Sequence, residues 1–360
     1  MINSYSEAVP PLLIYDVSGS RSGPGTCDSQ TSFLFINNRS MADVVVWPNP
    51  ASNYKDFAAA EARSSTPWQL NAFWSLESSE YYEQVKDARQ LLRKGSEKAF
   101  DLEMTYLTTS DIPMPYAYSF INFFKPKIDY EQKRQDKIAA AFISNCSPMN
   151  NRKEVLAELI ELLPGKIDSF GSCIQNANTT EVLEKLNLLE EGKKLSMWEE
   201  KTKIIERYKF TIAFENSNDE DYVTEKVCLS LEAGSPPIHL GLTSDQLEKF
   251  KPSPNAAINV ADFPDVKSLA KRLEEISKNR EEYESMLDWK NMPLSGDFGK
   301  IVRWGKESEW CRLAKLLRKT WSNPNAFNKQ RYENFYLRRK LKPIQSFNLS
   351  APMFHTKPHF

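Results

Sequence analysis

The sequence predicts an α/β protein of two domains. The chain has 360 residues, enough for two domains of typical size, and it is 41% hydrophobic and 26% charged, as ordinary globular cores require. Residues 208–241 have the pattern strand, loop, helix, strand, which is half of a doubly wound α/β unit. Residues 137–143 form an apolar run of the kind found in buried parallel strands. We therefore expect a parallel sheet flanked by helices, preceded by a less regular α/β domain.

The composition excludes several classes of protein. The net charge of −1 argues against an electrostatic nucleic-acid binder. No run of 18 apolar residues is present, and residues 1–9 lack the features of a signal peptide. The five cysteines form no C-x-x-C pair, which disfavours a zinc site, and their odd number leaves at least one thiol unpaired.

The first domain is expected over residues 1–125, followed by a linker over 126–136. Its predicted strands cover 11–17, 43–47, 69–76 and 100–106, with a Ser/Gly loop reaching about residue 25 and a helix over 84–98. The composition of residues 120–135, which is aromatic and then strongly charged, indicates a linker between the domains.

The second domain is expected over residues 137–300. Its predicted strands cover 137–143, 166–170, 208–214, 236–240 and 257–260. Its predicted helices cover 152–163, 223–233, 266–277 and 280–289, whereas 179–206 reads as helical or loop-like. Gly234 is a common residue just past a helix end. Residues 301–360 are expected to contain a last helix over 307–318 and a tail, packed back on the first domain.

Polar residues gather where ligands bind in such folds, at the carboxyl ends of strands and the first turns of helices. Arg152 and Lys226 each lie at a predicted strand-to-helix junction, and two cations there suit a diphosphate. Two solvated cations at helix starts are the alternative. Glu215, Asn216, Tyr222 and Glu225 could contact a base and a ribose. Alternatively, Asn216 caps the loop, Tyr222 fills the core or its rim, and Glu225 forms a local ion pair with Lys226.

Two further features of the sequence bear on chemistry. Residues 219–221 read Asp-Glu-Asp and resemble a D-x-D metal motif, but a solvated charge run is the favoured interpretation. Glu77 ends an aromatic run in the first domain, where apolar neighbours would raise its pKa and suit it to general-base work. A surface or capping glutamate is the commoner role for such a residue. His239, inside an apolar strand, is interpreted as a core histidine.

The stretches over 213–226 and 233–241 closely resemble the signature of the α1,3/4-fucosyltransferases, glycosyltransferase family 10. They read Ala-Phe-Glu-Asn-Ser, then Asp-Tyr-Val-Thr-Glu-Lys, then Ala-Gly-Ser-Pro-Pro-Ile. Residues 140–146, 167–173, 110–116 and 288–290 are similar to further motifs of that family. The resemblance covers roughly residues 70–300 and is most specific over 137–241.

The resemblance implies a GT-B type fold, two Rossmann-like domains facing a central cleft, and inverting transfer of fucose from GDP-fucose. Arg152 and Lys226 would hold the diphosphate and stabilise the departing GDP, and Glu77 would be the general base. The catalytic residues implied are therefore Glu77, Arg152 and Lys226. The donor-binding residues implied are Ser144, Asn145, Arg152, Tyr208, Asn216, Tyr222, Glu225 and Lys226. No obligatory metal is implied, although a divalent cation such as Mn can stimulate family members.

The acceptor implied is a glycan or glycoprotein. Residues 77–82 and 140–146 look most like the plant-type core enzymes, which fucosylate the innermost N-acetylglucosamine of N-glycans. A Lewis-type enzyme, a protein O-fucosyltransferase, a transferase using another nucleotide sugar and an inactive glycan-binding member are the alternatives. The family also implies a Golgi lumenal location with a type II anchor that this chain lacks, a cytosolic protein being the alternative.

The resemblance also implies a disulfide between the ends of the chain. Family members carry a C-x-x-C near the C-terminus, each cysteine bridged to the N-terminal domain. Here the matching residues are Cys311-Arg-Leu-Ala314, with alanine at the second position, and Cys27 is the sole cysteine of the N-terminal region. One bridge, Cys27–Cys311, is therefore expected.

Overall fold

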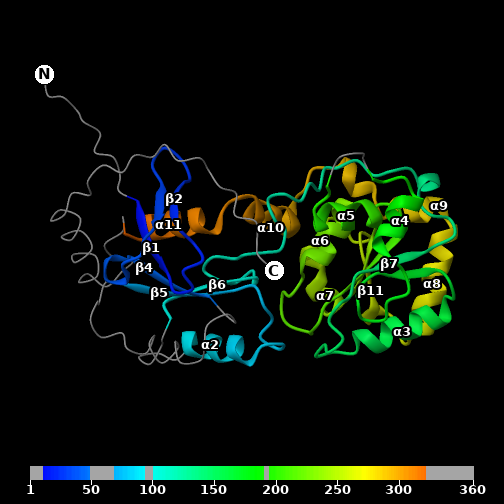
Figure 1. Cartoon of the computed structure of the whole chain (residues 1–360), viewed down its shortest axis with the longest axis horizontal. Helices are drawn as coiled ribbons and strands as arrows, with labels where there is room; N and C mark the ends of the chain where they lie inside the picture. Colours follow the sequence, from blue (N-terminus) through cyan, green and yellow to red (C-terminus); the bar gives the residue numbers. More distant parts are fainter. Residues whose placement is uncertain (1–10, 49–68, 94–99, 190–193, 322–360) are drawn as a thin grey trace, which may run out of the picture.

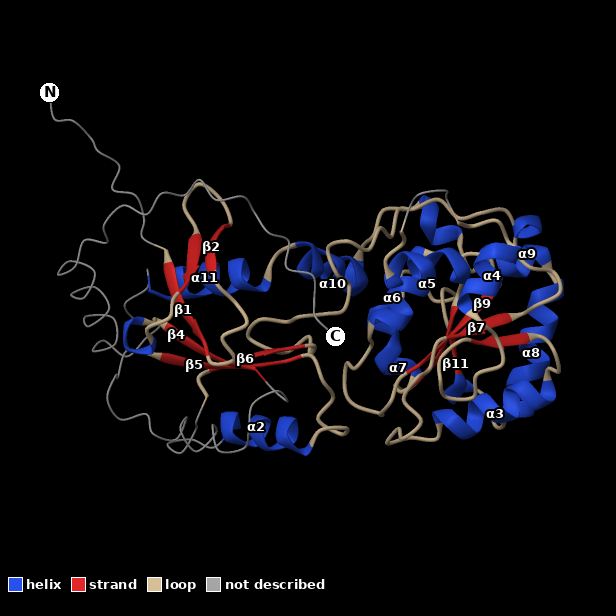
Figure 2. Cartoon of the chain, in the orientation of Figure 1, coloured by secondary structure: helices blue, strands red, loops and turns tan. Residues whose placement is uncertain are grey.

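The computed structural model describes residues 11–48, 69–93, 100–189 and 194–321, and these form two α/β domains side by side (Figure 1). Each domain has its own sheet, one of six strands and one of five. Figure 2 shows helices packed on both sides of the strands in the C-terminal half. The predicted α/β class is confirmed. The tail beyond residue 321 lies outside the described residues.

The N-terminal sheet has the strand order β2-β3-β1-β4-β5-β6. Its strands are β1 (Leu12–Asp16), β2 (Gly23–Thr26), β3 (Ser32–Phe35), β4 (Val44–Pro48), β5 (Leu70–Ser75) and β6 (Leu102–Thr105). Neighbouring strands are parallel except β2 and β3, which are antiparallel. The prediction of a loop up to residue 25 was wrong, because β2 pairs with β3 at the edge of the sheet although its sequence has little strand propensity. Gly25 allows this pairing because the Phe33 ring occupies the space of a side chain there.

Within the described residues, one helix covers each face of this sheet. Helix α2 (Glu83–Arg93) packs Val85 and Ala88 on the face that carries Trp47 and Phe73. The other face is covered by α11 (Glu309–Trp321), whose buried residues share a core with the strands. The residues of that helix in the shared core are Trp310, Cys311, Leu313, Ala314 and Leu317. The N-terminal domain thus combines strands from the first part of the chain with a helix that follows the C-terminal domain.

The C-terminal sheet is entirely parallel, with the strand order β11-β10-β9-β7-β8. Its strands are β7 (Ala139–Ala141), β8 (Ile167–Ser169), β9 (Phe210–Phe214), β10 (Pro237–Leu240) and β11 (Ile258–Asn259). Along β9 the side chains alternate between two cores, because successive residues of a strand point to opposite faces. Ile212 and Phe214 face one core and Ala213 faces the other.

Helices cover both faces of this sheet. They are α3 (Arg152–Leu162), α4 (Thr179–Lys185), α5 (Met197–Ile205), α6 (Glu225–Glu232), α7 (Ser244–Leu247), α8 (Val266–Lys278), α9 (Arg280–Ser285) and α10 (Gly296–Lys306). Short 3-10 turns cover Arg39–Met41, Tyr130–Gln132, Glu248–Phe250, Val260–Asp262 and Asp288–Asn291. Helices α3 and α8 bury Leu159 and Leu273 on one face, while α6 and α10 bury Leu229 and Ile301 on the other. The sequence did not predict α10, and α9 is shorter than expected.

The segment before the predicted linker already packs against the C-terminal domain. Ile121 and Phe123 share a core with α6 and α10. Within the linker, Lys133 is buried and donates hydrogen bonds to the carbonyl oxygens of Glu206 and Tyr208, 2.9 and 3.1 Å away. Burial lowers the pKa of Lys133 to about 7, although the Glu206 carboxylate opposes the shift. The linker is therefore fixed to the second domain.

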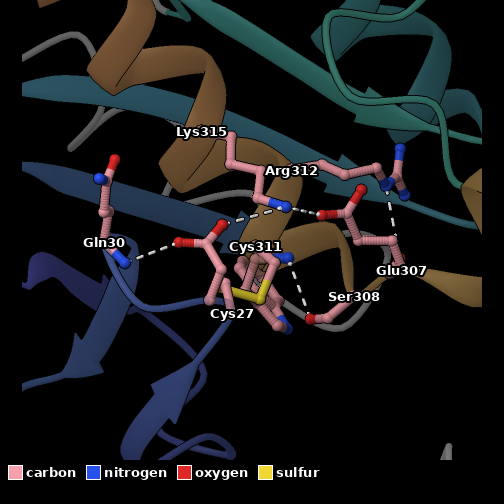
Figure 3. Close-up of a disulfide and its surroundings, with 9 residues drawn as sticks. Cys27, Gln30, Glu307, Ser308, Cys311, Arg312 and Lys315 are labelled. Atoms are coloured by element: carbon pink, nitrogen blue, oxygen red, sulfur yellow. Dashed lines mark hydrogen bonds and ion pairs between the residues drawn. A yellow bond between two sulfur atoms is a disulfide. The ribbon is translucent and has the colours of Figure 1, made fainter.

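Two disulfides occur among the described residues. Cys27, just after β2, is joined to Cys311 on α11, so the bridge ties the first and last parts of the N-terminal domain together (Figure 3). Lys315, beside it, pairs with Asp28 at 3.3 Å and with Glu307 at 2.7 Å. Cys146 pairs with Cys173, and Cys228 is unpaired and buried. Among the described residues, no helix is both long and apolar enough to cross a bilayer.

Replacing both Cys27 and Cys311 by alanine should lower the free energy of unfolding by about 3–5 kcal/mol, because the bridge restricts a very long loop of the unfolded chain. Urea denaturation under non-reducing conditions measures the change. The matched control is the double alanine variant of Cys146 and Cys173, whose residues are 27 apart rather than 284. A smaller loss is expected there. Peptide mapping that finds Cys27 and Cys311 as free thiols would contradict the bridge.

Candidate functional site

The site forms where the parallel strands of the C-terminal sheet end and face the N-terminal domain. The loop after β7, the loop after β9 and the first turn of α6 meet there. Arg152 is the first residue of α3 and Lys226 lies in the first turn of α6, as the sequence predicted. Both cations thus lie beside helix N-termini, where backbone N–H groups and the helix dipole favour anions.

Arg152 is held rigidly across two strand ends. Its guanidinium is buried and donates from Nη1 to the carbonyl oxygen of Phe214 at 3.2 Å and from Nη2 to that of Asn145 at 3.0 Å. Burial lowers the pKa of Arg152, opposed by Glu215 and by more distant acids. Its Nε atom is buried and has no hydrogen-bond partner among the described residues. The guanidinium therefore presents a fixed positive charge at the ends of β7 and β9.

Lys226 is surrounded by acceptors. Its Nζ lies 2.8 Å from Thr224 Oγ1 and 3.3 Å from both Glu215 Oε2 and Glu225 Oε1. Burial alone would lower its pKa, but the Glu215 and Glu225 carboxylates outweigh burial and raise it. The side chain of Lys226 is 24% exposed, so its ammonium group remains reachable. The lysine is charged and oriented by two acids.

Glu215 is a structural residue of this site. Its side chain is fully buried, and the carboxylate accepts hydrogen bonds from the Thr224 N–H at 2.8 Å and the Thr224 hydroxyl at 2.9 and 3.0 Å. Burial raises its pKa although Lys226 and Thr224 oppose the shift. The carboxylate therefore makes its hydrogen bonds and its ion pair within the protein, with Thr224 and Lys226. Our interpretation of Glu215 as a ligand contact was wrong.

The remaining residues predicted to contact the donor differ in how deeply they are buried. Tyr222 is buried against Tyr106 and Tyr116, with ring centroids 5.0 and 6.3 Å away. Glu225 and Asn216 are half-buried, and Ser144 is exposed. The Asn145 side chain donates to the Tyr81 hydroxyl at 2.8 Å, a contact between the domains.

Glu77 reaches this group of residues from the N-terminal domain, just after β5. Burial raises its pKa. The Lys226 charge and the Tyr222 hydroxyl oppose that shift, whereas the Glu225 charge adds to it. The structure thus brings Glu77 together with Tyr222, Glu225 and Lys226, from two domains.

The interpretation of residues 219–221 as a solvated charge run was wrong for both aspartates. Asp219 is buried and accepts hydrogen bonds from Ser78, Ser79 and Tyr106 of the other domain. Asp221 is also buried. It accepts from the Thr108 N–H and hydroxyl at 2.9 and 2.6 Å and pairs with Lys249. The hydrogen-bond donors from the other domain are more than 100 residues away in the chain, so no local pattern could reveal them.

Tyr208 was predicted to contact the donor, and the structure contradicts this. Its side chain is fully buried, and its hydroxyl donates to Asp168 at 2.5 Å and accepts from Arg134 at 2.9 Å. Tyr208 precedes β9 and so lies at the amino edge of the sheet, about 20 Å from the carboxyl end of that strand at Phe214. It packs the core beside Phe170.

A cavity of about 360 Å³ lies at the ends of β10 and β11. It is lined by Asn151, Asn218, Asp219, Glu220, Leu240, Gly241, Leu242, Thr243, Gln246, Asn259, Val260 and Ala261. The predicted donor-binding residues do not line it, although Asn151 is next to Arg152. His239, beneath it, is fully buried, and burial lowers its pKa to about 4. Its Nε2 accepts from the Leu242 N–H at 3.1 Å, which fits a core histidine.

Sequence reasoning missed three contributors to the site. Thr224 links Glu215 to Lys226, Tyr81 meets Asn145, and Lys201 of α5 interacts with Glu225. Tyr81 and Thr224 lay within stretches already singled out, whereas Lys201 lay in a charged region without a distinctive pattern. In the described part of the chain, no group of three or more His, Cys, Asp or Glu is arranged to hold a metal ion.

Comparisons with known proteins agree with this arrangement. Residues 132–334 match the family model described as glycosyltransferase family 10 (fucosyltransferase), C-terminal. The match covers more than half of the chain, and the chain belongs to this family of glycosyltransferases. A fucosyltransferase-like protein of Arabidopsis thaliana is 34% identical over 260 residues, covering 72% of this chain and 45% of that protein.

Other relatives carry names with different acceptors. The GDP-fucose protein O-fucosyltransferase 3 of Gallus gallus is 31% identical over 169 residues, covering 46% of this chain and 33% of that protein. The 4-galactosyl-N-acetylglucosaminide 3-alpha-L-fucosyltransferase 9 of Rattus norvegicus is 28% identical, covering 65% of this chain and 57% of that protein. The chain thus spans from a third to under three fifths of the length of these curated relatives.

The fold comparison identifies the architecture. A crystal structure of an alpha1,3-fucosyltransferase is similar to this chain with a TM-score of 0.53 and 16% sequence identity. The similarity covers 85% of this chain and 93% of the other. The predicted GT-B type fold of two Rossmann-like domains is thereby confirmed.

The Tyr208→Phe variant should lower the free energy of unfolding by about 1–3 kcal/mol, because the buried Asp168 and Arg134 each lose one hydrogen bond, to the Tyr208 hydroxyl. Urea denaturation followed by circular dichroism measures the loss. Tyr118→Phe is the matched control. The Tyr118 hydroxyl is buried and has no partner within the described residues, so its removal should not destabilise the protein. Equal effects of the two variants would contradict the structural role of the Tyr208 hydroxyl.

Proposed function

We propose that this protein transfers L-fucose from GDP-fucose to an acceptor hydroxyl with inversion at the fucose anomeric carbon. The observation that carries the proposal is that hydrogen bonds from Ser78 and Ser79 to Asp219 hold Glu77 of one domain within electrostatic reach of Lys226, Glu225 and Tyr222 of the other. The family of the chain supports the transfer of fucose. A nucleotide sugar would lie against the C-terminal domain with its anomeric carbon facing Glu77.

On the donor side, the diphosphate would bind at the first turn of α6. Lys226 supplies a charged ammonium group, and the fixed Arg152 guanidinium supplies a second positive charge behind it. Negative charge grows on the β-phosphate as its bond to the anomeric carbon breaks, so fixed cations stabilise the transition state more than the ground state. Glu225 would accept hydrogen bonds from ribose hydroxyls, with Asn216 and Tyr222 completing the donor pocket.

On the acceptor side, Glu77 would act as the general base. The acceptor hydroxyl oxygen attacks the anomeric carbon, its proton passes to the Glu77 carboxylate, and the bond from the anomeric carbon to the phosphate oxygen breaks. Such a single displacement inverts the anomeric configuration and needs no enzyme nucleophile. The raised pKa of Glu77 suits a base that works near neutral pH.

For the acceptor, we propose the innermost N-acetylglucosamine of an N-glycan, with formation of an α1,3 linkage. The similarity of residues 77–82 to plant-type core enzymes supports this choice. A protein hydroxyl is the second candidate, favoured by the 31% identity to a protein O-fucosyltransferase. An acceptor-array assay with GDP-fucose decides between N-glycan cores, N-acetyllactosamine and folded protein domains.

We propose the Golgi lumen as the site of action. Two disulfides within one chain favour an oxidising compartment, since cytosolic thiols are kept reduced. The acceptors proposed above are also found in the secretory pathway.

The donor assignment predicts that GDP and GDP-fucose raise the melting temperature of the protein, whereas UDP and UDP-galactose do not. Lys226→Ala should weaken GDP binding by at least about 10-fold, because a charge-assisted contact to phosphate is lost. Isothermal titration measures the affinity. Lys278→Ala, which changes an exposed lysine of α8, is the control and should leave GDP affinity unchanged. Stabilisation by the uridine ligands alone would defeat the assignment.

The Glu77→Gln variant should keep GDP-fucose affinity and lose turnover by about 10²- to 10⁴-fold, because glutamine cannot accept the acceptor proton. Initial rates at saturating donor and acceptor measure the loss. Glu80→Gln is the matched control, since Glu80 is an exposed carboxylate of the same segment. Unchanged turnover in Glu77→Gln would remove Glu77 as the base.

The pH dependence of kcat should show an acidic limb above the usual pKa of a glutamate, because the base must be ionised and burial raises the pKa of Glu77. Tyr222→Phe removes a hydroxyl that favours the charged form of Glu77, so the limb should move to higher pH in that variant. Rates measured at saturating donor from pH 4 to 9 test both points. A limb that moves to lower pH in Tyr222→Phe would contradict this contact.

A further inference from the structure

We propose that Asp219 is a positioning residue that holds the segment carrying Glu77 against the donor domain. This inference rests on the proposed function, since it concerns the placement of the proposed base. Asp219 belongs to the loop between β9 and α6, whereas Glu77 follows β5 of the other domain. The two residues do not share an element, and the link between them is a set of hydrogen bonds.

One oxygen atom of Asp219 makes this link. Its Oδ2 accepts from the Ser79 N–H at 2.7 Å, the Ser79 hydroxyl at 2.8 Å and the Ser78 hydroxyl at 3.0 Å. It also accepts from the Tyr106 hydroxyl at 2.6 Å. Burial alone would raise the pKa of Asp219, but these hydrogen bonds lower it, so the carboxylate is ionised. Hydrogen bonds to a buried, ionised carboxylate are strong and specific. These four hydrogen bonds to Asp219 form one connection between the domains, the Asp219 joint.

The joint acts directly on the backbone beside Glu77. Ser78 and Ser79 are the next two residues, and the Ser79 bond is made by the main chain itself. The segment is fixed at two further points. The Tyr116 hydroxyl donates to the Leu76 carbonyl oxygen on one side, and Asn145 donates to the Tyr81 hydroxyl on the other. Glu77 thus projects from a short segment held at both ends, and Asp219 holds its middle to the donor domain.

The same loop carries donor-site residues. Asn216 precedes Asp219 and Tyr222 follows it, and the loop leads into the α6 turn that bears Lys226. The bonds to Asp219 therefore set the position of the proposed base relative to the donor pocket, and their loss would free the segment with Glu77. The distance between an attacking hydroxyl and the anomeric carbon must be set closely, and a misplacement of about 1 Å can cost about 100-fold in rate.

Asp221 provides an internal comparison. It is buried in the same interface, accepts from Thr108 and pairs with Lys249, so it also joins the two domains. It makes no hydrogen bond in the structure to the segment that carries Glu77. If docking of the domains were all that mattered, loss of either carboxylate would have the same consequence. If Asp219 positions Glu77, its loss alone should act on turnover.

The test uses the full chain and compares the wild type with Asp219→Ala, Asp219→Asn and Asp221→Asn. Asp219→Ala should lower kcat by about 10- to 100-fold with GDP affinity unchanged. Asp219→Asn, which keeps one acceptor oxygen, should recover part of that loss. Asp221→Asn should change kcat less than 3-fold, since asparagine also tolerates the positive φ of 59° at this position. Equal losses of kcat in Asp219→Ala and Asp221→Asn, or a weakened GDP affinity alone, would overturn the proposal.

A double-mutant cycle gives a second readout that docking alone would not produce. In the Glu77→Gln background, Asp219→Ala should cause no further loss of kcat, because the base it positions is already gone. Full additivity of the two losses would overturn the proposal.

Hydrogen exchange separates failure of this inference from failure of the proposed function. In Asp219→Ala and Asp219→Asn, amides of residues 78–82 should exchange faster, whereas those of β9 should not change. Unchanged exchange in residues 78–82 overturns the positioning role even if the wild type transfers fucose. Faster exchange, together with no fucosyl transfer by the wild type, overturns the proposed function and with it the catalytic consequence of this joint.

Discussion

The start of α6 depends on one buried carboxylate. Glu215, at the end of β9, accepts from the backbone N–H and hydroxyl of Thr224 and lies beside the Lys226 ammonium group. A buried acid is unfavourable unless donors and opposite charge compensate it, and here one helix start supplies both. The strand end, the N-cap residue and the lysine are thereby locked in one arrangement. The contacts proposed between a donor diphosphate and the first turn of α6 depend on this arrangement.

The balance of charge around this carboxylate suggests how an anionic ligand enters. Arg152 and Lys226 face Glu215 and Glu225, so the cations are compensated before any ligand binds. Glu215 cannot turn away, because Thr224 holds it and its side chain is fully buried. Glu225 keeps 20% of its side chain exposed, whereas the Glu215 side chain has no exposed surface. In the proposed function, an incoming diphosphate would therefore displace Glu225 rather than Glu215 from Lys226.

The sequence predicted what depends on local patterns. Arg152 and Lys226 were placed correctly because hydrophobic periodicity marks the starts of their helices, and Gly234 has the positive φ of 63° expected past a helix end. The role of Tyr208 was predicted wrongly because a strand pattern does not show which end of the strand lies at the site. Asp219 and Asp221 were misread because the groups that donate hydrogen bonds to them, on Ser78, Ser79, Tyr106 and Thr108, come from the other domain. The edge strand β2 was missed because its pairing with β3, not its own propensity, makes it a strand.

The N-terminal domain is formed by two parts of the chain that are far apart in sequence, and this affects the site. The N-terminal sheet is completed by α11 from the C-terminal end, fastened by Cys27 and Cys311, while Ile121 and Phe123 already belong to the second core. The chain therefore crosses between the domains twice, and both crossings are packed. With the joint at Asp219 as a third connection, the base-bearing segment can move relative to Lys226 only if several packed contacts yield together. The position of the segment with Glu77 relative to Lys226 is therefore set by the packing of both crossings as well as by the hydrogen bonds to Asp219.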